Sequence, residues 1–157
     1  MTPSRSQLLA IYMNDHLAGS AAGVEMARRT RDANAGTEFG EPLATLCREI
    51  EADRENLESL MGELGVSRSR LKPALGWIAE KLGRVKLNGQ LHGYSPLSRV
   101  VELEGLVLGS TGRIRLWRLL AELVGEQTSA DLPLMIAGAE DQRGRLEALQ
   151  LRAARLL

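Results

Sequence analysis

The sequence is poor in cysteine and contains no long apolar run. Cys47 is the single cysteine among 157 residues, so no disulfide can form within the chain, and this favours a reducing compartment. No stretch approaches the roughly 18 apolar residues of a membrane span, and the N-terminus lacks the apolar core and cleavage site of a signal peptide. We therefore expect a cytoplasmic protein that does not enter a membrane.

A net charge and the common catalytic motifs are also missing. The 20 Lys and Arg residues balance 20 Asp and Glu residues. Because no global field attracts an anionic partner, we expect no binding to nucleic acid. The sequence contains no G-x-x-x-x-G-K-S/T phosphate loop, no G-x-S-x-G elbow and no H-E-x-x-H metal site. Three common routes to an enzyme thus have no support.

What the sequence does contain is a helix-forming pattern. Aromatic residues make up only 3% of the chain, while Leu, Ala, Glu and Arg are abundant, and this mixture favours helices over strands. The length favours one all-α domain over residues 1–157, with a short extra helix at 73–82 in the long connection between the second and third helices. Apolar residues recur at three- and four-residue spacings in four segments. These predicted helices run from about Ser4 or Ser6 to Arg31, from Glu41 to Leu64, from Ser95-Pro96 to Val124, and from Ser129 or Asp131 to the C-terminus.

One short frame occurs twice in the chain. Residues 51–60 read EADRENLESL and residues 140–149 read EDQRGRLEAL, so the frame E-x-x-R-x-x-L-E-x-L recurs after 89 residues. An offset of 90 between the first and third helices also aligns Gly19 with Gly109 and Arg28 with Arg118. The chain therefore looks like a duplicated helix pair, joined by a long crossover.

Four long helices with a crossover between the second and third resemble the ferritin-like superfamily. The stretches NDHLAGSAAGVEMARR, KLNGQLHGYSPLSR and ELEGLVLGSTGRIRLW are similar to those of uncharacterised bacterial ferritin-like proteins. The resemblance covers nearly the whole chain and implies an up-down-down-up four-helix bundle. It implies no particular activity, because none is associated with that subgroup.

The metal motif of the superfamily is replaced in this sequence. Metal-binding members carry a Glu on each of two helices and a Glu-x-x-His pair on each of the other two. The corresponding pairs here are Glu51-x-x-Arg54 and Glu140-x-x-Arg143. A guanidinium stays protonated and offers no lone pair to a metal ion. We therefore expect no standard di-metal site and no cofactor.

The helical wheel leaves two interpretations of these pairs open. Glu51 and Glu140 fall outside the apolar stripes of their helices, which favours i,i+3 ion pairs on the surface. The alternative is a core polar network at mid-bundle, because Asp53 and Gln142 lie closer to the stripe centres. The candidate members of this network are Glu51, Asp53, Arg54, Glu104, Glu140, Gln142 and Arg143.

Three functional hypotheses follow from this pattern. The leading one is a non-enzymatic interaction or structural protein, in which Glu/Arg ion pairs replace the metal centre. A competing one is a di-iron or di-manganese oxidoreductase, or a metal-storage protein, with an atypical carboxylate-rich site of His16, Asp53 and Glu104 plus a flanking Glu. The third is a binder of a small apolar ligand, since few aromatic residues and many glycines could leave a cavity in the bundle core.

Glycines inside the predicted helices bear on how the helices pack. Gly19 and Gly23 are four residues apart, as are Gly105 and Gly109, although each mid-helix glycine costs about 1 kcal/mol relative to alanine. Small residues let helices approach closely, so we expect the first and third helices to cross here, within the subunit or across a dimer axis. Apolar residues on several sides of the first helix further favour a homodimer.

Overall fold

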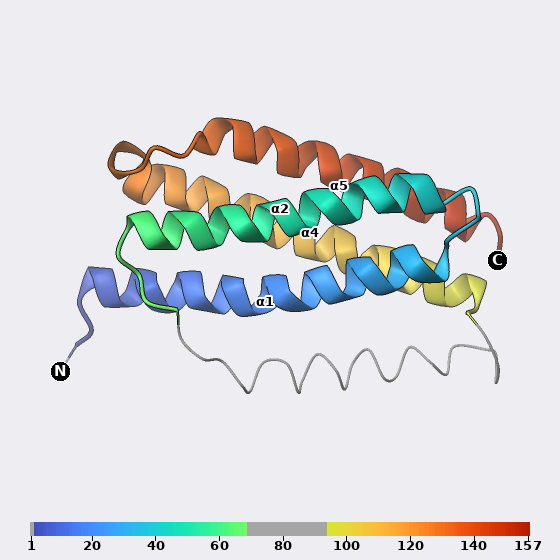
Figure 1. The fold of residues 1–157 in the computed structure, drawn as a ribbon, viewed down its shortest axis with the longest axis horizontal. Helices are drawn as coiled ribbons and strands as arrows, with labels where there is room; N and C mark the ends of the chain where they lie inside the picture. The colour runs from blue at the N-terminus through green and yellow to red at the C-terminus, as the bar shows by residue number, and fades with distance from the viewer. Residues whose placement is uncertain (1, 69–93) are drawn as a thin grey trace.

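The computed structural model describes residues 2–68 and 94–157, which form four long α-helices and one 3-10 turn (Figure 1). No strand occurs in these two ranges, so the all-α prediction is confirmed for them. The predicted short helix at 73–82 lies outside the described residues. The helices are α1 (Arg5–Ala33), α2 (Gly40–Glu63), α4 (Pro96–Val124) and α5 (Leu132–Ala154), with η1 (Gly125–Gln127) between the last two.

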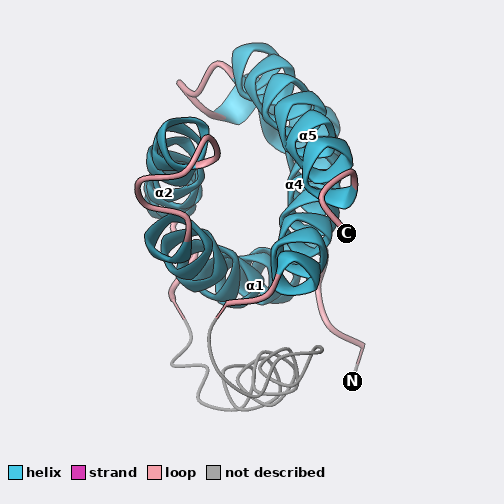
Figure 2. Cartoon of the chain, turned by 90° about the vertical axis from the view of Figure 1, so that its right-hand side faces the viewer, coloured by secondary structure: helices cyan, strands magenta, loops and turns pink. Residues whose placement is uncertain are grey.

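Neighbouring helices of the bundle run antiparallel. Figure 1 shows α1 and α5 running in one direction along the long axis, and α2 and α4 running in the other. α1 packs against α2 and α4, and α4 packs against α5. Figure 2, seen along the bundle, shows α2, α1, α4 and α5 following one another around the core. α2 therefore ends, and α4 begins, at opposite ends of the bundle.

Side-chain caps fix where three of the helices begin. Ser4 before α1, Ser95 before α4 and Asp131 before α5 each accept a hydrogen bond from a backbone N–H in the first turn. These three caps are among those predicted. Gly65 follows the end of α2, and its φ of 67° lies in the left-handed region that favours glycine. The N–H of the next residue donates to the carbonyl of Met61 at 2.8 Å.

Apolar side chains form two core clusters, one toward each end of the bundle. One cluster includes Leu57 of α2 and Ala139 of α5, and the other includes Ile50 of α2 and Leu146 of α5. On both helices a buried polar residue lies between the two clusters in sequence, at position 53 of α2 and position 142 of α5. The core is therefore interrupted at mid-bundle by polar groups.

The apolar faces predicted for α1 are only partly buried. Met13, Leu17 and Val24 belong to the core, whereas Leu8 is 52% exposed and Ile11 is 55% exposed. α1 thus uses one apolar side against its two neighbours and leaves another uncovered among the described residues. None of the helices in the described ranges has the length and apolar character needed to cross a membrane.

Candidate functional site

Asp53, Arg113 and Gln142 form a central polar cluster between the two apolar clusters. Arg113 Nη1 donates to Asp53 Oδ2 at 2.9 Å and to Gln142 Oε1 at 2.7 Å. Gln142 Nε2 donates to the same Asp53 oxygen at 2.9 Å. The three side chains come from α2, α4 and α5, so one small set of hydrogen bonds joins three helices.

Burial dominates the electrostatics of the central polar cluster. The Asp53 and Arg113 side chains are 11% and 12% exposed. Burial raises the pKa of Asp53 above its usual 3.8, by more than Arg113 and Gln142 lower it. Burial also lowers the pKa of Arg113, although a guanidinium remains charged in proteins. Each partner is therefore the main compensation for the buried charge of the other.

The structure brings together only part of the expected network. Asp53 and Gln142 meet, as the helical wheel indicated. Glu104 lies on the exposed side of α4. The buried acid of that helix is Glu102, two residues earlier in the chain. Arg113 completes the cluster although no sequence signal distinguishes it from the other arginines of α4. The angular position of a residue on a single helix does not reveal which partner its side chain reaches.

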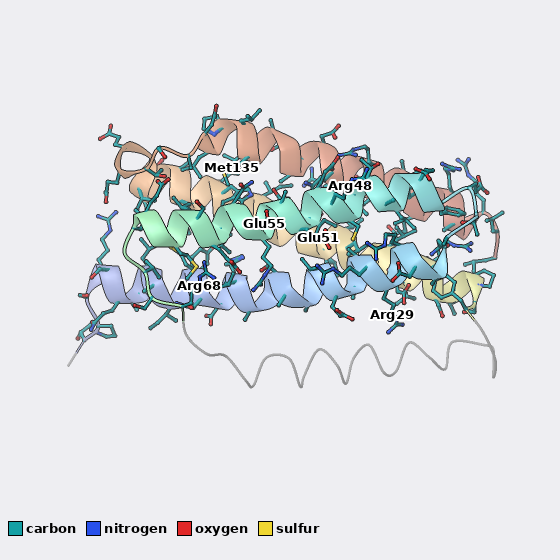
Figure 3. All side chains as sticks on the ribbon, viewed as in Figure 1. Arg29, Arg48, Glu51, Glu55, Arg68 and Met135 are labelled. Carbon is teal, nitrogen blue, oxygen red and sulfur yellow. The ribbon has the colours of Figure 1, made fainter. Side chains whose placement is uncertain are left out.

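The two copies of the repeated frame form matching ion pairs outside this cluster. Arg28 of α1 pairs with Glu51 of α2 at 2.6 Å, and Arg118 of α4 pairs with Glu140 of α5 at 2.5 Å. All four side chains are partly exposed, and Figure 3 labels Glu51 beside α2 on the side toward α1. The glutamates thus pair across to the neighbouring helix instead of with the arginines three residues later in the frame.

The two arginines of the frame have unlike surroundings. Arg54 Nη1 donates to the carbonyl of Leu17 at 2.8 Å and to Ser20 Oγ at 2.9 Å, which ties α2 to α1. Both arginines also pair with the glutamate four residues later on their own helix, Arg54 with Glu58 at 3.0 Å and Arg143 with Glu147 at 3.6 Å. Only Arg54 makes the additional contacts to a neighbouring helix. The guanidinium at the centre of the bundle is therefore that of Arg113, and neither arginine of the frame takes that place.

A cavity of about 350 Å³ opens between α1 and α4 and reaches α2. Four glycines line it, and we call it the glycine-lined cavity: Gly19 and Gly23 from α1, and Gly109 and Gly112 from α4. The apolar side chains that border it are Leu57, Leu116 and Trp117, and the polar ones are Asp15, His16, Ser20, Asp53, Arg54 and Arg113. The central polar cluster therefore forms part of the cavity wall.

The glycines of this wall do not bring helices into close contact. A Cβ added at Gly19, Gly23 or Gly109 would meet no atom within 4 Å, so the close crossing expected within the subunit does not occur at these three positions. Gly105 differs, because a Cβ there would lie 2.8 Å from Met26 Sδ. α1 and α4 do pack against each other, but they leave a hollow where the sequence predicted their closest approach.

The residues of the atypical metal site are not assembled as a set. His16 and Asp53 border the same cavity, whereas Glu104 is exposed elsewhere on α4. Burial lowers the pKa of His16, with a partial opposing effect from Asp15, and the imidazole meets the Tyr12 ring edge-on with centroids 4.6 Å apart. Within residues 2–68 and 94–157 no group of three or more His, Cys, Asp or Glu side chains could hold a metal ion.

A second polar network joins α1 to the start of α4. Glu102 is 1% exposed, and its Oε1 lies 2.7 Å from Arg29 Nη2. Tyr94 donates its hydroxyl to Glu102 Oε2 at 2.7 Å, and Asn34 Nδ2 donates to the Tyr94 hydroxyl at 3.1 Å. Burial, together with the bond to Glu102, raises the pKa of Tyr94. We interpret these contacts as structural, because they hold two chain segments in register.

No protein family, curated protein or solved structure matches the chain. The functional interpretation of the cavity therefore depends on its own geometry and chemistry.

Replacing Arg113 tests the central polar cluster. We expect Arg113→Met to lower the free energy of unfolding by about 3–5 kcal/mol, because it leaves the buried Asp53 carboxylate without its charge partner. Adding Asp53→Asn should recover most of this loss, since the second change removes the unpaired charge. Urea denaturation of the single and double variants measures both effects.

The surface ion pair of the second frame provides the control. Arg118→Met should change the free energy of unfolding by less than about 1 kcal/mol, because that pair is half exposed. A loss of similar size for Arg113→Met and Arg118→Met would contradict the assignment of the central polar cluster as a buried, stability-determining contact.

The raised pKa of Asp53 predicts a pH dependence of stability. The native state holds this proton more tightly than the unfolded chain, whose carboxyl has a pKa near 3.8. The resulting stabilisation is fully present below 3.8 and is lost as the pH rises through the higher pKa of the folded state. The difference in unfolding free energy between the unaltered chain and Asp53→Asn should follow this titration, and a carbon-detected NMR titration of the Asp53 carboxyl should give a midpoint above 3.8. A midpoint at or below that value would contradict the dominant effect of burial.

Proposed function

We propose that the protein is a non-enzymatic, ferritin-like bundle that binds a small ligand with an apolar body in the glycine-lined cavity. The observation that carries this proposal is the wall of four helical glycines that no packing contact requires. Each of them costs about 1 kcal/mol in helix stability relative to alanine. Alanine would fit at every one of these positions in the unliganded chain, so the glycines are better explained by a molecule that occupies the space.

The dimensions and lining of the cavity support this function. Its volume of about 350 Å³ is within the range of roughly 300–1,000 Å³ that is usual for small-molecule sites. Leu57, Leu116 and Trp117 lie behind the glycine wall, and a few polar groups border the cavity, of which Asp53 and Arg113 belong to the central polar cluster. Such a combination of an apolar wall and a few placed polar groups is typical of sites that bind and orient one molecule.

The ferritin-like assignment, with its crossover and internal duplication, belongs to the same proposal. The directions of the four helices support it, because two antiparallel pairs with α2 parallel to α4 correspond to an up-down-down-up bundle (Figure 1). The matching pairs Arg28–Glu51 and Arg118–Glu140 support the duplication, since they join residues that the two alignments made equivalent. Asp53 and Gln142 are equivalent in the same way, and they share Arg113.

The metal-dependent alternative has less support than ligand binding. In ferritin-like metalloproteins the ligands project into the bundle core from facing helices. At mid-bundle this chain has a guanidinium held by one carboxylate and one amide. Arg113 supplies a fixed positive charge there, which disfavours a cation. An oxidoreductase or metal-storage role would need donors that the described residues do not bring together.

We expect the cavity to take up a small molecule with a six-carbon chain, and a matched set of such probes tests the function. Hexanol, hexanoate and hexylamine share an apolar chain and differ in their polar end. At least one of them should bind the full chain in calorimetric titration and shift the indole N–H signal of Trp117, which a Trp77→Phe variant identifies in the NMR spectrum. Gly112→Leu should weaken this binding at least about tenfold, because the added side chain occupies the cavity.

An exposed helical glycine outside the cavity gives the matched control for this experiment. Gly138→Leu on α5 introduces the same side chain where the glycine also has no neighbour within 4 Å, and it should leave binding unchanged. The proposed function fails if none of the three probes binds, or if Gly112→Leu and Gly138→Leu affect binding equally.

We also propose a cytosolic homodimer that uses the uncovered side of α1. An apolar groove of about 320 Å³ lies there, bordered by Arg5, Leu8, Leu9, Tyr12, Leu119 and Leu123. The formal net charge of zero supports a second copy as the occupant, because two copies do not repel each other at long range. A two-fold axis would place the same exposed leucines of each copy opposite one another.

Light scattering coupled to size-exclusion chromatography tests the dimer. The unaltered chain should elute with twice the mass of one subunit, and Leu8→Glu should shift it to the monomer, because a buried glutamate would lack a partner at the interface. Leu151→Glu on α5, where the leucine is similarly exposed, is the control and should leave the mass unchanged. A monomeric unaltered chain would remove this part of the proposal.

A further inference from the structure

One buried hydrogen-bond donor beside the glycine-lined cavity lacks a partner. Trp117 borders the cavity and is fully buried, and its indole Nε1–H has no acceptor among the described residues. An indole N–H can only donate a hydrogen bond. A buried donor without an acceptor destabilises the protein by roughly 1–3 kcal/mol, so such groups are uncommon unless something else satisfies them. The nitrogen itself is not accessible from the cavity, so this donor marks a local loss of stability directly behind the cavity wall.

Arg113 adds further donors to the same wall. Its Nη1 atom makes both hydrogen bonds of the central polar cluster, to Asp53 and to Gln142. Its Nε and Nη2 atoms make no hydrogen bond to any residue in the described ranges, and Arg113 borders the cavity. These two atoms form one edge of the guanidinium, and that edge matches the two oxygens of a carboxylate. The cavity therefore offers a two-pronged donor.

The charges around the cavity are compatible with one additional anion. Its charged lining residues are Asp15, Asp53, Arg54 and Arg113, and His16 is the remaining titratable one. Asp15 is exposed, so solvent screens its charge. Asp53 lies close enough to repel a bound anion, but burial already raises the pKa of this carboxyl, so protonation of Asp53 can relieve the repulsion. Arg113 then remains as the attracting charge, because Arg54 is already paired with Glu58 at 3.0 Å.

We propose that the ligand of the glycine-lined cavity is a small organic acid, whose carboxylate binds the free edge of Arg113 while its apolar chain lies against the glycines, Leu116 and Trp117. This inference rests on the proposed function and specifies the chemistry of its ligand. A neutral alcohol has one uncharged oxygen, so it cannot place one oxygen on each of the two nitrogens of the guanidinium edge as a carboxylate does. An ammonium group has no acceptor and is repelled by Arg113. Selection therefore depends on the polar end of the ligand.

The chain-matched probes test the acid directly on the full protein. Hexanoate should bind at least about tenfold more tightly than hexanol, which corresponds to one charge-assisted hydrogen-bonding contact, and hexylamine should bind more weakly than either. The indole N–H signal of Trp117, which lies directly behind the cavity wall, should shift when hexanoate binds. Equal affinities for hexanoate and hexanol would contradict the proposal that the ligand is an acid, but not the proposal that the cavity binds a ligand. If none of the three probes binds, the proposed function itself is wrong.

Substitutions at the central polar cluster supply the second arm of the test. Removal of Arg113 alone would leave the buried Asp53 carboxylate without a charge partner. Arg113→Gln is therefore made together with Asp53→Asn, which keeps a neutral hydrogen-bonding pair. This double variant should bind hexanoate about as weakly as hexanol, with its hexanol affinity within about twofold of the unaltered chain. Asp53→Asn alone should increase the preference for hexanoate, because it removes the carboxylate that repels the bound anion and keeps Arg113. A double variant that still prefers hexanoate would overturn the role of Arg113, and circular dichroism confirms that each variant is folded.

Discussion

The buried contact between Asp53 and Arg113, shared with Gln142, is the interaction on which the rest of the structure depends. A charge in the middle of a helical bundle is tolerated only when it is paired and hydrogen-bonded. Arg113 Nη1 meets this requirement with two acceptors from two other helices. The contact divides the apolar core into two clusters and fixes which faces of α2, α4 and α5 turn inward. Only α1 contributes nothing to it.

The absence of α1 from this contact explains where the hollow lies. Under the proposed duplication, Gly23 of α1 is the counterpart of Arg113 of α4, because the two helices align at an offset of 90. One guanidinium already serves both Asp53 and Gln142, so a second one from α1 would have no partner and would crowd the first. Glycine at position 23 avoids this and leaves the cavity open. The candidate site thus exists because the two proposed halves differ here, with glycine at position 23 and arginine at position 113.

The ends of the bundle compensate for the loosely filled middle. At one end Phe39 lies between two guanidinium groups, with Arg99 4.5 Å and Arg152 5.3 Å from the ring centre. The network around Glu102 fixes α1 to the start of α4 at the same end. Helical glycines and an unsatisfied indole at mid-bundle reduce stability, and such local losses are common where a protein keeps a site open for binding.

The sequence alone determined the four helices and the cap at Ser95, and it restricted the caps of α1 and α5 to two candidates each, because capping and helical periodicity act within one helix. It gave the inward position of Asp53 and Gln142 as one of two interpretations. It predicted neither the role of Arg113 nor the exposure of Glu104. It assigned the glycines of α1 and α4 to close helix packing, which most of them do not make within the subunit. Those features depend on the rotation of each helix against its neighbours, and on the reach of a long arginine side chain across the core. A cavity is shared by the walls of several helices, so only the tertiary structure decided that the glycines enclose a space instead of a contact.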